Sequence, residues 1–135
     1  MSQYRTPTAK SKYYVPKEVY LTTLHYCRQY PLWLAELETE PDASKAITYD
    51  KERVQSSNSY DATSEIAMHR VDIAKKKARV DDVSATVAGD LAQWLRLGVC
   101  YGLTYTDLAA RGIPCADRTY YRMRKRFYYE LSKII

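Results

Sequence analysis

Glycine and histidine are scarce in this sequence, and their scarcity argues against several kinds of active site. Four glycines in 135 residues leave little material for a glycine-rich loop around a phosphate, and no P-loop, G-x-S-x-G or H-E-x-x-H motif is present. There are two histidines, His25 and His69, and His25 stands two positions from Cys27, a spacing at which side chains do not share a helical face. We therefore expect a protein without enzymatic activity.

Cysteine and long apolar runs are also scarce. The three cysteines, Cys27, Cys100 and Cys115, are widely spaced and form no C-x-x-C pair, so we expect buried thiols, no metal and no cofactor. No run of about eighteen apolar residues could span a bilayer, and the N-terminus lacks the apolar stretch of a signal peptide. These absences predict a soluble cytoplasmic protein.

The net charge of +5 is confined to the last third of the chain. Residues 1–90 hold thirteen basic and thirteen acidic side chains, whereas residues 91–135 hold eight Lys and Arg against three Asp and Glu. A localised basic surplus is expected of a surface that meets phosphates, although the solvated faces of ordinary helices also carry charge.

Apolar spacing predicts an all-α protein, with an N-terminal helical region over residues 13–82 behind a disordered lead-in at residues 1–12. The first helix should begin near Pro16. Pro31 removes a backbone donor and disfavours a helical Tyr30, so we expect a kink or a fresh start there. The apolar side chains that recur at three- and four-residue steps in these two helices are Val19, Tyr20, Leu24, Cys27, Leu32, Trp33, Leu34 and Leu37.

A polar stretch at about 39–59 predicts a long loop in this region. A helix capped by Asp61 should follow, and its apolar residues at 66, 73 and 80 repeat at sevens, which fits packing within the monomer or a homodimer. The pair Asp81-Asp82 should mark a helix boundary, and a further amphipathic helix should begin at Val83 and end near Gly98 and Gly102.

The pattern of capping and turn residues within 83–135 predicts a C-terminal helix-turn-helix. Thr104 should cap a short helix, Tyr105 to Ala110, with Leu108 facing inward, and Gly112 should take the left-handed conformation that ends it. A turn through Ile113 and Pro114 then leads to Asp117, the expected cap of the last helix.

That last helix has two distinct faces when it is plotted at one hundred degrees per residue. Its core face, expected to pack on Leu91, Trp94, Leu95 and Leu108, consists of Tyr120, Met123, Phe127, Leu131 and Ile134. Its opposite face consists of Arg118, Arg122, Lys125 and Tyr129, flanked by Thr119, Tyr121 and Arg126. Since arginine forks pair with guanine edges and phosphates, these seven residues are the predicted contacts to double-stranded DNA.

The stretch LTYTDLAARGIPCADRTYYRMRKRFYYELSKII, residues 103–135, resembles the final helix-turn-helix of sigma-factor-like proteins. Within that group, the chain is similar to small prophage regulators of the RinA and ArpU type, and the similarity is best over residues 83–135. The resemblance implies a DNA-binding regulator of phage late-gene transcription.

Two functions of different class fit these features. The first is a DNA-binding transcription regulator with a basic recognition helix. The second is a phage-encoded factor that binds another protein, such as a host nuclease or host RNA polymerase, or a small DNA-packaging subunit, because fourteen tyrosines suit protein interfaces equally well. The near-neutral N-terminal region is expected to self-associate or to contact polymerase through aromatic side chains that we predict to be exposed, namely Tyr13, Tyr20, Tyr26, Tyr30 and Trp33.

Overall fold

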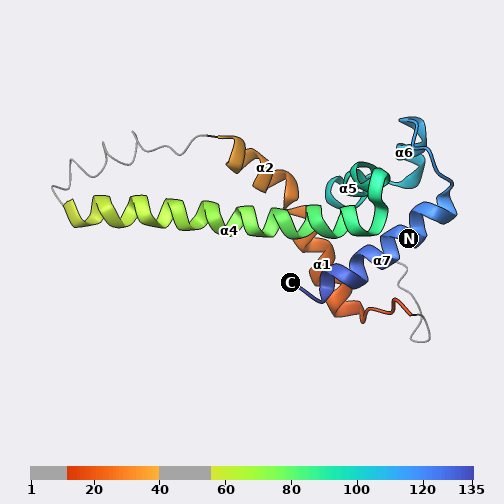
Figure 1. The fold of residues 1–135 in the computed structure, drawn as a ribbon, viewed down its shortest axis with the longest axis horizontal. Helices are drawn as coiled ribbons and strands as arrows, with labels where there is room; N and C mark the ends of the chain where they lie inside the picture. The colour runs from red at the N-terminus through yellow and green to blue at the C-terminus, as the bar shows by residue number, and fades with distance from the viewer. Residues whose placement is uncertain (1–11, 40–55) are drawn as a thin grey trace. The chain divides into compact units, whose positions relative to one another are not determined.

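The computed structural model describes residues 12–39 and 56–135, with the backbone alone over 56–63 (Figure 1). Its elements are α1 (Lys17–Arg28), α2 (Tyr30–Glu38), α4 (Ser56–Ala88), the short 3-10 helix η2 (Gly89–Leu91), α5 (Ala92–Tyr101), α6 (Tyr105–Ala110) and α7 (Asp117–Ser132). These two ranges contain no strand, which confirms the all-α prediction. None of the helices described there is both long and apolar enough to cross a membrane.

Two compact units make up the described chain. One unit contains the residues up to Pro31 together with Ala78–Ile135, and the other contains Leu32–Lys77. The predicted regions, 13–82 and 83–135, divide the chain at a different place, because α1 packs against α5 and α7. The predicted lead-in, except for Lys12, and most of the predicted loop at 39–59 lie outside the described residues.

Both N-terminal helices begin beside a proline. Pro16 is the residue before α1, and a new helix, one of the two outcomes expected at Pro31, follows as α2. This helix already begins at Tyr30, which was expected to be disfavoured in a helix, and Pro31 lies in its first turn. Leu24 and Cys27 of α1 are buried, as expected from their spacing. Val19 is instead 41% exposed, because α1 turns its Tyr20 side toward its neighbours in the unit.

The prediction of a helix boundary at Asp81-Asp82 is wrong. Helix α4 begins at Ser56, ahead of the predicted cap at Asp61, and continues through both aspartates to Ala88. Asp81 has a structural role inside the helix, since its Oδ1 accepts a hydrogen bond from the Tyr30 hydroxyl at 2.6 Å and lies 3.7 Å from Nε of Arg96.

The break falls further along, at Gly89, whose φ of 54° is left-handed and therefore suited to glycine. η2 begins there and leads into α5, so the single helix predicted from Val83 to near Gly98 and Gly102 is divided in two. This correction matters for the fold because it gives α5 a direction of its own.

In the unit formed by Leu32–Lys77, a side chain from α4 caps the C-terminal end of α2. The Arg70 guanidinium donates hydrogen bonds to the carbonyl oxygens of Glu36 at 2.8 Å, Leu37 at 3.0 Å and Thr39 at 2.9 Å. These carbonyls have no partner within the helix, and a cation also suits the negative end of the helix dipole. Ile73 is buried in the monomer, as expected if the seven-residue repeat packs within the monomer and not in a homodimer.

The core of the other unit forms where α1, α5 and α7 meet, and Figure 1 shows α1 close to the C-terminal part of α7. Its fully buried side chains include Leu95, Leu108, Tyr120, Phe127 and Leu131. This confirms most of the core face predicted for the last helix.

Two parts of the core prediction need correction. Ile134 was placed on the core face of the last helix but is 50% exposed, because α7 ends at Ser132. Tyr20, Tyr30 and Trp33, which were expected to be exposed, are buried. The N-terminal region therefore lacks most of the aromatic surface that motivated the prediction of self-association.

Candidate nucleic-acid interface

The short helix α6 is fixed at its start by a capping box. The hydroxyl of Thr104 accepts a hydrogen bond from the Asp107 backbone N–H at 3.2 Å, and Oδ2 of Asp107 accepts one from the Thr104 backbone N–H at 3.0 Å. Two backbone donors that a helix leaves unpaired are satisfied in this way. The predicted cap at Thr104 is confirmed.

The end of α6 is a Schellman motif. Gly112 takes a φ of 95° and donates its N–H to the carbonyl of Ala109, while Ile113 donates to the carbonyl of Leu108 at 3.1 Å. Ile113 and Leu108 are both buried, which supplies the apolar contact that accompanies this motif. Glycine is favoured here because its φ lies in the left-handed region.

The turn after α6 leads directly into α7. Its last residue, Ala116, is the N-cap of α7, one position before the predicted Asp117, and no side chain caps the helix there. Asp117 lies in the first turn, where its Oδ1 accepts a hydrogen bond from the Arg118 backbone N–H at 2.7 Å. The Tyr105 hydroxyl donates to the Cys115 carbonyl at 2.5 Å, which ties the turn back to α6.

We expect Thr104→Ala to reduce stability by about 1 kcal/mol, because it removes the acceptor for the Asp107 backbone N–H. Urea unfolding followed by circular dichroism measures this loss. Thr106→Ala, an exposed change within the same helix, is the matched control and should have little effect. Equal stability of the two variants would contradict the role assigned to the capping box.

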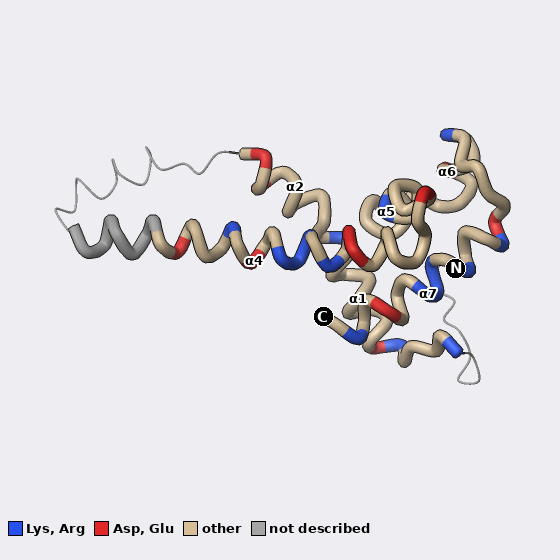
Figure 2. The backbone as a smooth tube through the Cα atoms, in the orientation of Figure 1, with Lys and Arg blue, Asp and Glu red and all other residues tan. Residues whose placement is uncertain are grey.

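Four of the seven predicted DNA contacts lie on one exposed face of α7. Arg118, Thr119, Arg122 and Lys125 are all exposed. Within the described part of the chain, none of the three basic side chains makes an ion pair or a hydrogen bond. Figure 2 shows Lys and Arg positions recurring along α7. This face therefore offers three cations that remain available to a ligand.

The other three predicted contacts are held by neighbours in the same chain. Tyr121 lies beneath the Arg124 guanidinium, whose Cζ is 4.7 Å from the ring centroid. The Tyr129 ring meets Tyr13 edge-on, and Nε of Arg126 lies 4.0 Å from Glu130. The structure thus narrows the available contacts to Arg118, Thr119, Arg122 and Lys125, which we call the α7 basic face.

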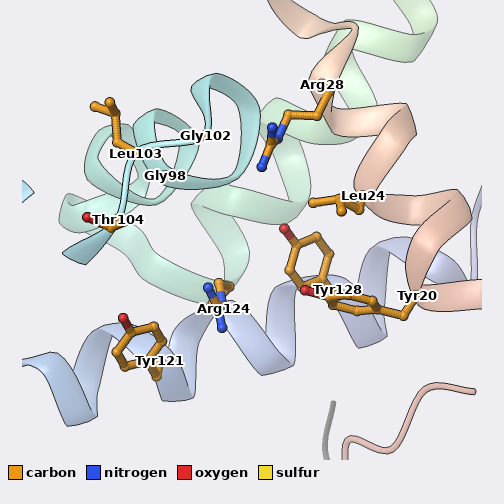
Figure 3. Close-up of a pocket in the computed structure, with 10 residues that line it drawn as sticks. All are labelled: Tyr20, Leu24, Arg28, Gly98, Gly102, Leu103, Thr104, Tyr121, Arg124 and Tyr128. Carbon is orange, nitrogen blue, oxygen red and sulfur yellow. The ribbon is translucent and has the colours of Figure 1, made fainter. Parts of the chain in front are cut away.

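A small pocket of about 40 Å³ lies beside α7, and sequence reasoning missed it. Figure 3 shows Arg28 from α1 and Arg124 from α7 among the residues that line it, with Tyr128 between them in this view. Burial raises the pKa of Tyr128 well above its usual value, so its hydroxyl is a proton donor at neutral pH. The packing of α1 on α7 brings these three side chains together. The spacing of residues within one helix could not predict this pocket.

The cysteines agree with the prediction of buried thiols at two of three positions. Cys27 and Cys100 are buried, whereas Cys115 is half-buried. Burial, followed by a hydrogen bond with Cys100, raises the pKa of the Cys27 thiol well above its ordinary value. No group of three or more metal-ligating side chains occurs among the residues that the structure describes.

Comparisons of the chain with family models, curated proteins and solved structures found no match. The resemblance to sigma-like and prophage regulators therefore stays a prediction based on residues 83–135.

Proposed function

We propose that this protein is a DNA-binding transcription regulator and that α7 lies in the major groove. The observation that carries the proposal is the α7 basic face, where three cations without a partner in the described chain and a hydroxyl are exposed on a helix whose other side is buried. The regulatory role follows the resemblance of the C-terminal residues to sigma-like prophage regulators.

The spacing of the basic face suits a helix in a groove. Arg118 and Arg122 are one turn apart, about 5 to 6 Å along the axis, and the major groove is wide enough to admit a helix. The N-terminal half of a recognition helix meets base edges, so Arg118, Thr119 and Arg122 are the proposed base contacts. Lys125, further along, is placed nearer a phosphate.

Removal of a base contact and removal of a phosphate contact should have different effects on DNA binding. Arg118→Ala or Arg122→Ala is expected to cost roughly 1–3 kcal/mol of binding and to relax specificity at one base. Lys125→Ala is expected to weaken specific and random duplexes alike and to lower the slope of log K against log salt by about one. Binding to both duplexes across a salt series measures these effects.

A matched control is Lys17→Ala, which removes one exposed cation from α1 and leaves α7 unchanged. Each variant is first shown to be folded by circular dichroism. Wild-type affinity for DNA in the Arg118, Arg122 and Lys125 triple alanine variant would refute the role of α7 as a recognition helix. The competing hypothesis, a factor that binds another protein, would then be favoured.

A further inference from the structure

The pocket beside α7 gathers positive charge without a balancing carboxylate. Arg28 and Arg124 contribute the only charged side chains among the described residues that line it, and both are arginines. Two guanidinium groups on one small pocket repel each other, so the arrangement favours an anion as its occupant. The remaining polar side chains of the lining are the hydroxyls of Tyr20, Thr104, Tyr121 and Tyr128.

Each arginine is held by a contact that leaves most of its donors unused. Arg28 donates from Nε to the carbonyl of Val99 at 3.3 Å, and its two terminal nitrogens have no hydrogen-bond partner in the described chain. The guanidinium of Arg124 lies over the Tyr121 ring, with Cζ 4.7 Å from the ring centroid, and its N–H groups have no hydrogen-bond partner in the described chain. Fixed orientation with free donors is a property of arginines that bind oxyanions.

Gly102 permits the approach of Arg28. It ends α5 with a φ of 75°, and a Cβ on this residue would lie 3.0 Å from Nη1 of Arg28. Any larger side chain would therefore compete with the guanidinium for the same space. The backbone at the end of α5 and the side chain from α1 together form this side of the pocket.

The Tyr128 hydroxyl is a second and independent sign of a ligand. Tyr128 is only 4% exposed and lines the pocket, yet its hydroxyl makes no hydrogen bond to any other described residue. In Figure 3 this hydroxyl points into the space between the two arginines. A buried hydroxyl without a partner is rare in folded proteins, because losing its bonds to water is costly, and a bound ion or water often explains it.

We infer that this pocket binds a phosphate group, held by the guanidinium groups of Arg28 and Arg124 and by the hydroxyl of Tyr128. A phosphate oxyanion has enough oxygen atoms to accept from all three side chains at once, and arginine forks match its geometry. The pocket is separate from the α7 basic face, so phosphate binding does not depend on the proposed role of that face. The phosphate belongs either to the DNA backbone or to a free phosphate compound.

Inorganic phosphate is the probe for the first experiment. Titration by calorimetry should show saturable binding to the wild-type protein, in a buffer whose ionic strength is matched with chloride. We expect Arg28→Gln and Arg124→Gln each to weaken binding at least tenfold and Tyr128→Phe to weaken it several-fold, whereas Arg111→Gln, an exposed change outside the pocket, should leave it unchanged. Binding that is absent in the wild type, or unchanged in the Arg28 and Arg124 double variant, would overturn the inference.

A measurement on the wild-type protein avoids any variant that fails to fold. Phenylglyoxal modifies accessible arginines, and mass spectrometry gives the rate at each position. Phosphate should slow the modification of Arg28 and Arg124 and leave Arg111 unaffected, whereas equal rates with phosphate and with chloride would count against the pocket.

The salt dependence of DNA binding identifies the source of the phosphate. If the pocket receives a phosphate of the duplex, Arg28→Gln should lower the salt slope by about one. If it receives a free phosphate compound, the same variant should keep the wild-type slope while losing inorganic phosphate. A protein that binds phosphate but not DNA would retain this inference and lose the proposed function, so the two failures are distinguishable.

Discussion

Phe127→Ala is expected to reduce the unfolding free energy by roughly 3–5 kcal/mol, the largest effect of any substitution considered for this chain. Phe127 is fully buried on the core face of α7 and stacks edge-on against Tyr128, with ring centroids 5.7 Å apart. Its removal leaves a cavity that the surrounding helices can fill only in part. Since small domains have a total stability of about 5–15 kcal/mol, the variant should be close to unfolding at 25 °C.

Urea unfolding monitored by circular dichroism measures this effect. Ile134→Ala is the matched control, because Ile134 was expected on the same face of the last helix but is 50% exposed beyond the end of α7. Its effect should stay within about 0.5 kcal/mol. Similar losses of unfolding free energy in the two variants would show that Phe127 is not a core residue.

Hydrogen exchange in a Phe127 variant tests whether the stability of α1 depends on α7. Helix α1 packs on α7, so loosening α7 should also lower the protection of amides in α1. A C-terminal region that folded apart from α1 would instead leave those amides unchanged. The experiment thus separates the observed packing from the division at residue 83 that the sequence favoured.

Local signals in the sequence were sufficient for the ends of α6. The capping residue Thr104, the inward Leu108 and the left-handed Gly112 were all predicted and are all present. Such features depend on hydrogen bonds between residues a few positions apart, which sequence displays directly. The burial of Phe127 and Leu131 was equally predictable, because one helical period separates core and solvent faces.

The path of α4 could not be predicted in the same way. Adjacent aspartates favour a helix start, but Asp81 is stabilised within the helix by Tyr30 and Arg96, which come from elsewhere in the sequence. The true break depends on Gly89, whose positive φ no periodicity reveals. Tertiary contacts and backbone conformation therefore outweighed local preference at this point.

The candidate site was only partly predictable for a related reason. Helical periodicity identified the exposed residues Arg118, Arg122 and Lys125 but placed Tyr121 and Tyr129 with them. Both tyrosines instead pack against other side chains, Tyr129 against Tyr13 from the segment before α1. An amphipathic pattern shows which side of a helix faces the core. It does not show which other segment packs on the residues that lie between the core face and the exposed face.

The approach of α7 to α5 depends on Gly98 in a way that composition alone would miss. Gly98 lies within α5, where alanine would ordinarily stabilise a helix by about 0.5–1 kcal/mol. Here a Cβ would overlap the Tyr120 hydroxyl oxygen and lie 2.9 Å from Cζ of the same ring. Tyr120 is 1% exposed, so neighbouring atoms surround the ring and leave it little room to move aside.

We therefore expect Gly98→Ala to destabilise the protein by roughly 1–3 kcal/mol, because it overpacks the contact between α5 and α7. Combining it with Tyr120→Phe should restore much of the loss, since the overlapping oxygen is gone, although Cζ remains close. Tyr120→Phe alone is the matched control, and the four proteins together give the coupling between the two positions by urea unfolding. A Gly98→Ala variant as stable as the wild type, or additive effects in the cycle, would show that α5 and α7 do not depend on this close approach.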